Sequence, residues 1–177
     1  MARIQQQDTA AFEELYARYS KRLLAFMCKM LGNEHRAQDL LQDLFLKIVE
    51  RPQLFNADKR FYTWVFTVAA NMCRNEYRNN NRQVISTEKI AHTEHAYTEA
   101  LVGHVDASLF TAGLGAALDT LGHEEKETFV LRFQQGFSIQ EIAEMMDCPE
   151  GTVKSRIYYV TRKLAGELQA FKPLLKQ

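Results

Sequence analysis

The chain has 177 residues, of which 46% are hydrophobic and 25% are charged, so composition predicts one or two globular domains and excludes a mainly disordered chain. Its 22 basic and 22 acidic side chains balance, which argues against strong non-specific binding of the whole chain to duplex DNA. The sequence lacks both a run of about 18 apolar residues and the apolar core of a secretion signal, so we expect a cytoplasmic protein with no membrane insertion.

The first part of the chain predicts a helical domain over residues 1–83. Only 3 Pro and 8 Gly occur in the whole sequence, which favours long helices over a turn-rich β architecture. Gly32 and Asn33 are typical of a helix end followed by a new start, Pro52 ends the next helix, and the run Asn79–Asn81 is expected to end another. Apolar residues at helical spacing therefore predict helices over 11–31, 34–50 and 60–79.

The second of these helices carries one leucine more than a single core needs. Its buried face is predicted to consist of Ala37, Leu40, Leu41, Leu44 and Ile48. Leu46 lies away from that face, among polar residues, and an exposed leucine within an acidic rim fits a protein-docking surface. The alternative is that Leu46 packs beneath the third helix or a linker.

The third helix has a polar face that suits nucleic acid. Its predicted core side consists of Phe61, Trp64, Val65, Val68 and Met72. The reverse side has small and polar groups followed by cations, at Thr63, Thr67, Ala70, Asn71, Arg74 and Arg78. Such a stripe allows close approach to a backbone or an unstacked strand, and Tyr62, Arg74, Tyr77 and Arg78 are the preferred contact candidates.

A second helical domain is predicted over residues 111–177, after a linker over 84–110 in which the helical pattern is lost. Ser138 and Glu141 form a predicted capping box, and Asp147-Cys148 separates this helix from a last one that has Pro149 in its first turn. Residues 151–177 carry six basic side chains and one acidic one. Two helices around a tight break, the second of them basic, predict a helix-turn-helix. The fold is thus expected to be all-α, with two small domains.

The last helix presents a polar face opposite its core side. Val153, Ile157, Val160, Leu164 and Leu168 share the core side, and Ser155, Tyr158, Tyr159 and Arg162 lie opposite. The first turns of such a helix reach deepest into a major groove, so Thr152, Ser155 and Arg156 are the leading base contacts. Lys154, Arg162 and Lys163 are better placed for phosphates. The alternative is a bundle helix whose basic face is only solvated.

Several segments, in this order and spacing, match a known pattern: 12–16 (FEELY), 37–46 (AQDLLQDLFL), 64–66 (WVF), 69–71 (AAN), 136–138 (GFS), 141–143 (EIA) and 148–156 (CPEGTVKSR). On these residues the chain resembles a bacterial sigma factor of the extracytoplasmic-function type, a two-domain initiation factor of RNA polymerase. The chain departs from the family pattern at Gln38, where an acid is usual, at Gly122, where Pro is usual, and in the sparse cations after Arg74.

The resemblance implies an alternative sigma factor that binds core RNA polymerase, directs it to specific promoters and assists DNA melting. The contacts that it implies with the clamp coiled coil of the polymerase are Asp39, Gln42, Asp43 and Leu46. For the −10 promoter element they are Tyr62, Thr63, Thr67, Asn71, Arg74 and Arg78, and for the −35 element Thr152, Lys154, Ser155, Arg156, Tyr159 and Arg162. Such factors are commonly held inactive by an anti-sigma factor, so that partner is expected too.

Other functions fit the sequence less well. Cys28, Cys73 and Cys148 are isolated, and the histidines at 92, 95 and 104 have no further ligands nearby, so neither a metal nor a cofactor is expected. A glycine-rich phosphate loop and a nucleophile with a paired base are both missing, so we expect no enzyme and no small-molecule substrate. A sigma-like decoy that binds only a regulatory protein, and a dimeric helix-turn-helix repressor, are the alternatives.

Overall fold

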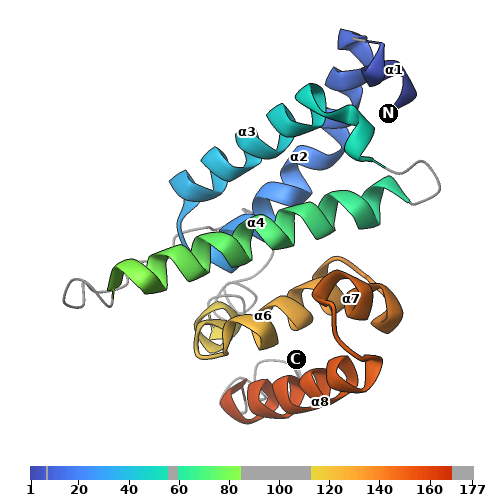
Figure 1. Cartoon of the computed structure of the whole chain (residues 1–177). Helices are drawn as coiled ribbons and strands as arrows, with labels where there is room; N and C mark the ends of the chain where they lie inside the picture. Colours follow the sequence, from blue (N-terminus) through green and yellow to red (C-terminus); the bar gives the residue numbers. More distant parts are fainter. Residues whose placement is uncertain (7, 56–59, 85–112, 169–177) are drawn as a thin grey trace, which may run out of the picture. The chain divides into compact units, whose positions relative to one another are not determined.

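The computed structural model describes residues 1–6, 8–55, 60–84 and 113–168, and the chain divides into two compact units, 1–95 and 96–177 (Figure 1). All regular structure within the described ranges is helical, which confirms the all-α prediction. Apart from Val84, the expected linker lies outside the described residues, so the predicted domain limits stay a prediction. None of the described helices combines the length and apolar character needed to cross a membrane.

The first unit is built on three long helices that pack against one another (Figure 1). Asp8 and Asn33 cap two of them, since each side chain accepts a hydrogen bond of 3.0 Å from the amide three residues later. The hydrogen bond from the backbone amide of Ala11, followed by the hydrogen bond from the Arg3 side chain, lowers the pKa of Asp8. The elements are α1 (Ala2–Gln5), α2 (Thr9–Leu31), α3 (Glu34–Glu50), the short 3-10 turn η1 (Pro52–Leu54) and α4 (Phe61–Val84).

Helix α4 is longer than the sequence predicted. It continues through Asn79–Asn81 to Val84, so the expected end at Asn79 is wrong. Asparagine in a helix interior costs about 0.7 kcal/mol per residue relative to alanine, and three such residues do not end a helix without a glycine or proline.

The core of the first unit lies between α2, α3 and α4. Phe26 and Phe66 are fully buried and meet edge to face, with ring centroids 5.5 Å apart. The predicted buried face of α3 is confirmed, with Phe45 added to it. The predicted core side of α4 is partly wrong: Phe61, Trp64, Val68 and Met72 are only half-buried. The buried side consists of Val65, Phe66, Ala69, Ala70 and Cys73, so Ala70 belongs to the core and not to the polar stripe.

The second unit contains the expected helix-turn-helix. Helix α7 ends at Met146, Asp147 takes a left-handed φ of 49°, and α8 begins directly after Pro149. Asp tolerates this conformation better than most residues other than Gly, which suits it to the turn. The unit comprises helical residues 113–119, α6 (His123–Phe129), the π-helical turn η2 (Val130–Gln134), α7 (Ile139–Met146) and α8 (Glu150–Glu167).

One apolar cluster joins α8 to the start of the second unit. Val160 and Leu164 of α8 pack with Ala117, Leu118 and Leu121, and all five are buried. Polar contacts reinforce this junction, because Lys163 Nζ donates to the carbonyl of Thr120 at 2.9 Å. The apolar side of α8 therefore packs against the rest of the unit, and this packing holds the polar face on the opposite side of the helix in place.

The capping box that begins α7 is present as predicted, and its loss should loosen the helix-turn-helix. Glu141 N donates to Ser138 Oγ at 3.1 Å, and Ser138 N donates to Glu141 Oε2 at 2.9 Å. We expect Ser138→Ala to destabilise α7 by about 1 kcal/mol. Native-state hydrogen exchange of the α7 amides measures this loss within the second unit, whereas the fluorescence of Trp64 reports on the first.

The matched control is Ser155→Ala. The Ser155 hydroxyl donates to the carbonyl of Gly151 within α8, at 2.9 Å, so this substitution should change the exchange of α7 little. Equal exchange rates in wild type and Ser138→Ala would contradict the prediction.

Candidate nucleic-acid interface

The polar stripe on α4 exists in the structure, although only part of it is open to solvent. Thr63, Thr67, Asn71, Arg74 and Arg78 lie at helical spacing on one side of α4. Asn71 and Arg78 are exposed, while the other three are half-buried. Thr67 Oγ1 donates to the carbonyl of Thr63 at 2.8 Å, so that hydroxyl is engaged within the helix. The groups of the stripe that are most accessible to a nucleic acid are the Asn71 amide and the Arg78 guanidinium.

Tyr62 lies on a different side of α4 from this stripe. Its ring packs against Phe66 and Tyr19, with centroid distances of 4.8 and 6.3 Å. The Arg22 guanidinium carbon lies 5.5 Å from the ring centroid, a cation–π geometry. The structure thus groups Tyr62 with α2 and not with Asn71 and Arg78.

A cluster of three rings covers the beginning of α4. Phe55, Phe61 and Trp64 have centroid distances of 5.4 to 5.6 Å, and all three are half-buried. Helical spacing predicts Phe61 and Trp64 as core residues, but it does not reveal their contacts with Phe55. In the sequence, Phe55 directly precedes residues 56–59, which are outside the described ranges.

The outward side of α3 forms what we call the docking surface: Asp39, Gln42, Asp43 and Leu46. All four residues are exposed, so Leu46 does not pack beneath another element of the described chain. Val49, which the sequence analysis did not single out, is also exposed and follows Leu46 by three residues, so the two neighbour each other on the helix. The docking surface is an apolar centre with carboxylates around it.

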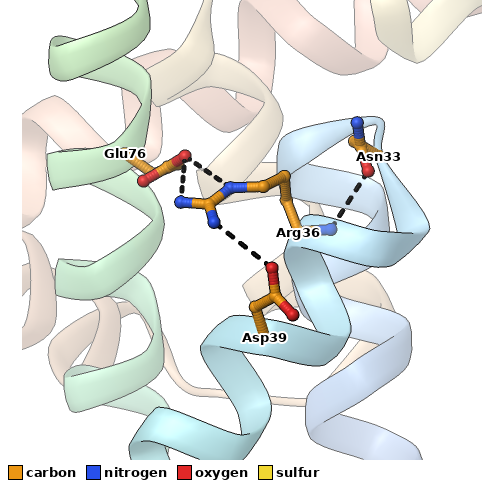
Figure 2. A network of polar contacts seen from close by, with 4 residues as sticks. All are labelled: Asn33, Arg36, Asp39 and Glu76. Atoms are coloured by element: carbon orange, nitrogen blue, oxygen red, sulfur yellow. Dashed lines mark hydrogen bonds and ion pairs between the residues drawn. The ribbon is translucent and has the colours of Figure 1, made fainter.

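Arg36 joins the docking surface to α4 (Figure 2). Its Nε and Nη2 donate to Glu76 Oε1 at 2.9 and 2.7 Å, and its Nη1 donates to Asp39 Oδ2 at 3.3 Å. The hydrogen bonds and charge of Glu76, followed by those of Asp39, raise the pKa of Arg36. Sequence reasoning missed this network, because Arg36 and Glu76 are 40 residues apart and neither is part of a motif.

The exposed face of α8 carries most of the predicted contact residues of the second unit. Lys154, Ser155, Tyr159 and Arg162 are exposed, together with Tyr158. Tyr158 and Tyr159 are 58% and 62% exposed, and their rings meet edge to face at 5.5 Å. Hydroxyl, aromatic and cationic groups on one open helix face can contact bases and phosphates in a major groove.

Thr152 and Arg156 lie at the flank of this face and are half-buried. Arg156 Nη2 pairs with Glu124 Oε2 of α6, and Arg156 Nη1 lies 3.8 Å from Cys148 Sγ. The guanidinium is thus held against its own unit, and contact with a base requires it to leave Glu124.

Comparison with known proteins accounts for both units. Residues 15–83 match the family model Sigma-70 region 2, and residues 112–164 match Sigma-70, region 4. The chain is 31% identical over 163 residues to the RNA polymerase sigma factor CarQ of Myxococcus xanthus, covering 90% of this chain and 91% of CarQ. It is 30% identical over 146 residues to the ECF RNA polymerase sigma factor EcfG of Rhodopseudomonas palustris, covering 82% and 78%.

A solved structure shows the same fold. The sigma factor RpoE of Bartonella quintana, crystallised with the anti-sigma factor NepR, aligns with a TM-score of 0.78 at 24% identity, over 90% of this chain and 97% of that one. The two family models together match more than half of the residues, and they occur in the order that the resemblance implied. On these grounds the chain belongs to the extracytoplasmic-function family of RNA polymerase sigma factors.

Proposed function

We propose that this protein is an alternative sigma factor that binds core RNA polymerase, directs it to specific promoters and assists the opening of the duplex. The observation that carries the proposal is the presence of both sigma-70 regions in one chain, each with an exposed face of suitable chemistry. The family regulates transcription, and bond-forming chemistry is left to the polymerase. Because the core enzyme works in the cytoplasm, we place the protein there.

Each face receives one role in this proposal. The docking surface on α3 contacts the clamp coiled coil, with Leu46 buried on binding and the carboxylates facing basic side chains. The stripe on α4 contacts the −10 element, where Asn71 and Arg78 are best exposed, and Tyr62 contributes only if its ring leaves the packing with Tyr19. The face of α8 reads the −35 element through Thr152, Lys154, Ser155, Arg156, Tyr159 and Arg162.

An anti-sigma factor is the expected regulator. The Bartonella relative was crystallised with such a partner, and the exposed leucine and acidic rim of α3 offer a surface that a competitor of polymerase can cover. A decoy needs only that surface, whereas this chain also presents an exposed basic and aromatic face on α8, which supports promoter binding.

Run-off transcription with purified core polymerase tests the proposal. Genomic fragments from the host are transcribed with and without the protein, and core binding is measured separately. Protein-dependent transcripts from a bipartite, asymmetric site support the sigma factor. Core binding without transcripts from any fragment favours the decoy, and binding to an inverted repeat without core binding favours the repressor.

The two tyrosines of α8 lead to a prediction about base preference. Exposed aromatic edges contact the 5-methyl group of thymine, so we expect replacement of thymine by uracil in the −35 element to weaken holoenzyme binding about two- to five-fold. The variant Tyr158→Ala/Tyr159→Ala should lose this sensitivity. Tyr16→Ala, which removes an exposed tyrosine of the first unit, should keep it. Equal sensitivity in all three proteins would exclude the tyrosine pair as the methyl contact.

A further inference from the structure

The stretch of α4 from residue 74 to residue 80 contributes no buried residue to the core. Among the residues of this helix whose side chains the structure describes, 61–80, Cys73 is the last buried one. The helix nevertheless continues to Val84 (Figure 1), which is about 12 Å beyond Glu76 at the usual rise per residue. The contact residues Asn71 and Arg78 lie on either side of the point where the apolar packing ends.

Glu76 forms an ion pair with Arg36 at this point of α4. Its side chain is only 15% exposed, whereas that of Asp39 is 59% exposed, so water screens the Arg36–Glu76 pair less than the Arg36–Asp39 pair. One carboxylate oxygen of Glu76 accepts from two nitrogens of the same guanidinium, and this charge-assisted contact links α3 to α4 (Figure 2). The third contact of this guanidinium reaches the docking surface itself.

We propose that Arg36 is a positioning residue that determines the position of the second half of α4 relative to the docking surface on α3. Polymerase bound at the docking surface then holds Asn71 and Arg78 in a fixed orientation toward the −10 element. This inference rests on the proposed function. It assigns to Arg36 and Glu76 an effect on promoter opening, although neither residue touches DNA or polymerase in this scheme.

The test separates promoter opening from core binding. The variants are Arg36→Ala, Glu76→Ala, the double alanine variant and the charge swap Arg36→Glu/Glu76→Arg. Arg18→Ala is the matched control, because it removes an exposed arginine paired with Glu14 at 2.7 Å inside a single helix. Core affinity is measured by competition, and the lifetime of the open promoter complex by challenge with heparin.

We expect each single alanine variant to shorten the open-complex lifetime about five-fold, with core affinity within about two-fold of wild type. The double variant should be no worse than either single variant, and Arg18→Ala should have no effect. The charge swap should restore the lifetime only in part, because it re-forms the pair between α3 and α4 but places a carboxylate beside Asp39. A role in folding alone would lower core affinity and lifetime by the same factor. Parallel losses, or a charge swap whose lifetime is no longer than that of the single alanine variants, would overturn the inference.

Hydrogen exchange in the free full-length protein tests, without polymerase, whether the Arg36–Glu76 pair stabilises this part of α4. Arg36→Ala and Glu76→Ala should speed exchange of the amides of residues 77–80, and Arg18→Ala should not; unchanged exchange overturns the inference whatever transcription shows. If wild type supports no core-dependent transcription, the proposed function fails. If wild type does and the variants match it, only this inference fails.

Discussion

Leu46→Asp is expected to weaken the binding of core polymerase about ten- to a hundred-fold while the free protein stays folded. Leu46 is 55% exposed in the structure, so the substitution removes little buried apolar contact within the chain. Burial of a leucine side chain at an interface contributes about 1.5–3 kcal/mol, and each 1.4 kcal/mol corresponds to about ten-fold in affinity. A carboxylate in its place must also lose its hydration on binding.

The matched control for this variant is Leu54→Asp. Leu54 is 60% exposed but belongs to η1 and lies outside the docking surface, so core affinity should stay near that of wild type. Affinity can be measured by competition with a labelled sigma factor, and circular dichroism checks the fold. Wild-type affinity of Leu46→Asp would exclude Leu46 from the interface, and equal losses in both variants would mean that the interface extends beyond α3.

The docking surface was predictable because α3 has a clean helical period. Its core side and its exposed side differ in composition, and the two signals at Asn33 and Pro52 fix its ends, so helical spacing alone places Leu46 outside the core. The helix-turn-helix was predictable for a similar reason. A capping box, a two-residue break and a proline-initiated helix are local signals, and local signals are what a single sequence shows best.

On α4 the prediction failed where its neighbours decide the outcome. Aromatic residues at helical spacing indicated a core side through Phe61 and Trp64, but Phe66 and the small residues Ala69 and Ala70 are the ones that are buried. The spacing of apolar residues shows which of them share a face of the helix. It does not show which face packs against other helices, so a face of large half-buried rings and a face of small buried residues look alike in the sequence. Three consecutive asparagines predict a helix end at Asn79, but α4 continues through them to Val84.

Contacts between distant residues have no local signal at all. Arg36 pairs with Glu76, and Arg156 pairs with Glu124, across 40 and 32 residues respectively. The sequence predicts Arg156 as a base contact and assigns no role to Arg36, and it shows neither of the two glutamate partners. In each case the glutamate partner limits which other groups the guanidinium can bind. The roles of these two arginines can therefore be argued only from the structure.

The Arg156–Glu124 pair leads to the second prediction, in which changing its two partners has opposite effects. Arg156→Ala is expected to weaken holoenzyme binding at the −35 element about ten-fold or more, because a bidentate contact of arginine with a base contributes about 1–3 kcal/mol. Glu124→Gln is expected to strengthen it about two- to five-fold. The substitution replaces a partly exposed ion pair, which is worth about 0.2–1 kcal/mol, by at most a neutral hydrogen bond, and it removes a negative charge near the phosphates.

Binding of labelled promoter DNA at constant salt measures both variants, and the salt matters because phosphate contacts depend on it. The fold should tolerate Glu124→Gln, since the Glu124 side chain is 65% exposed and Arg156 keeps its contact with Cys148. If both variants weaken binding equally, the Arg156–Glu124 pair has a structural role in joining α6 to α8, and Arg156 does not read the promoter. Opposite effects mean instead that Glu124 competes with DNA for Arg156, so that recognition of the −35 element includes the cost of breaking this pair.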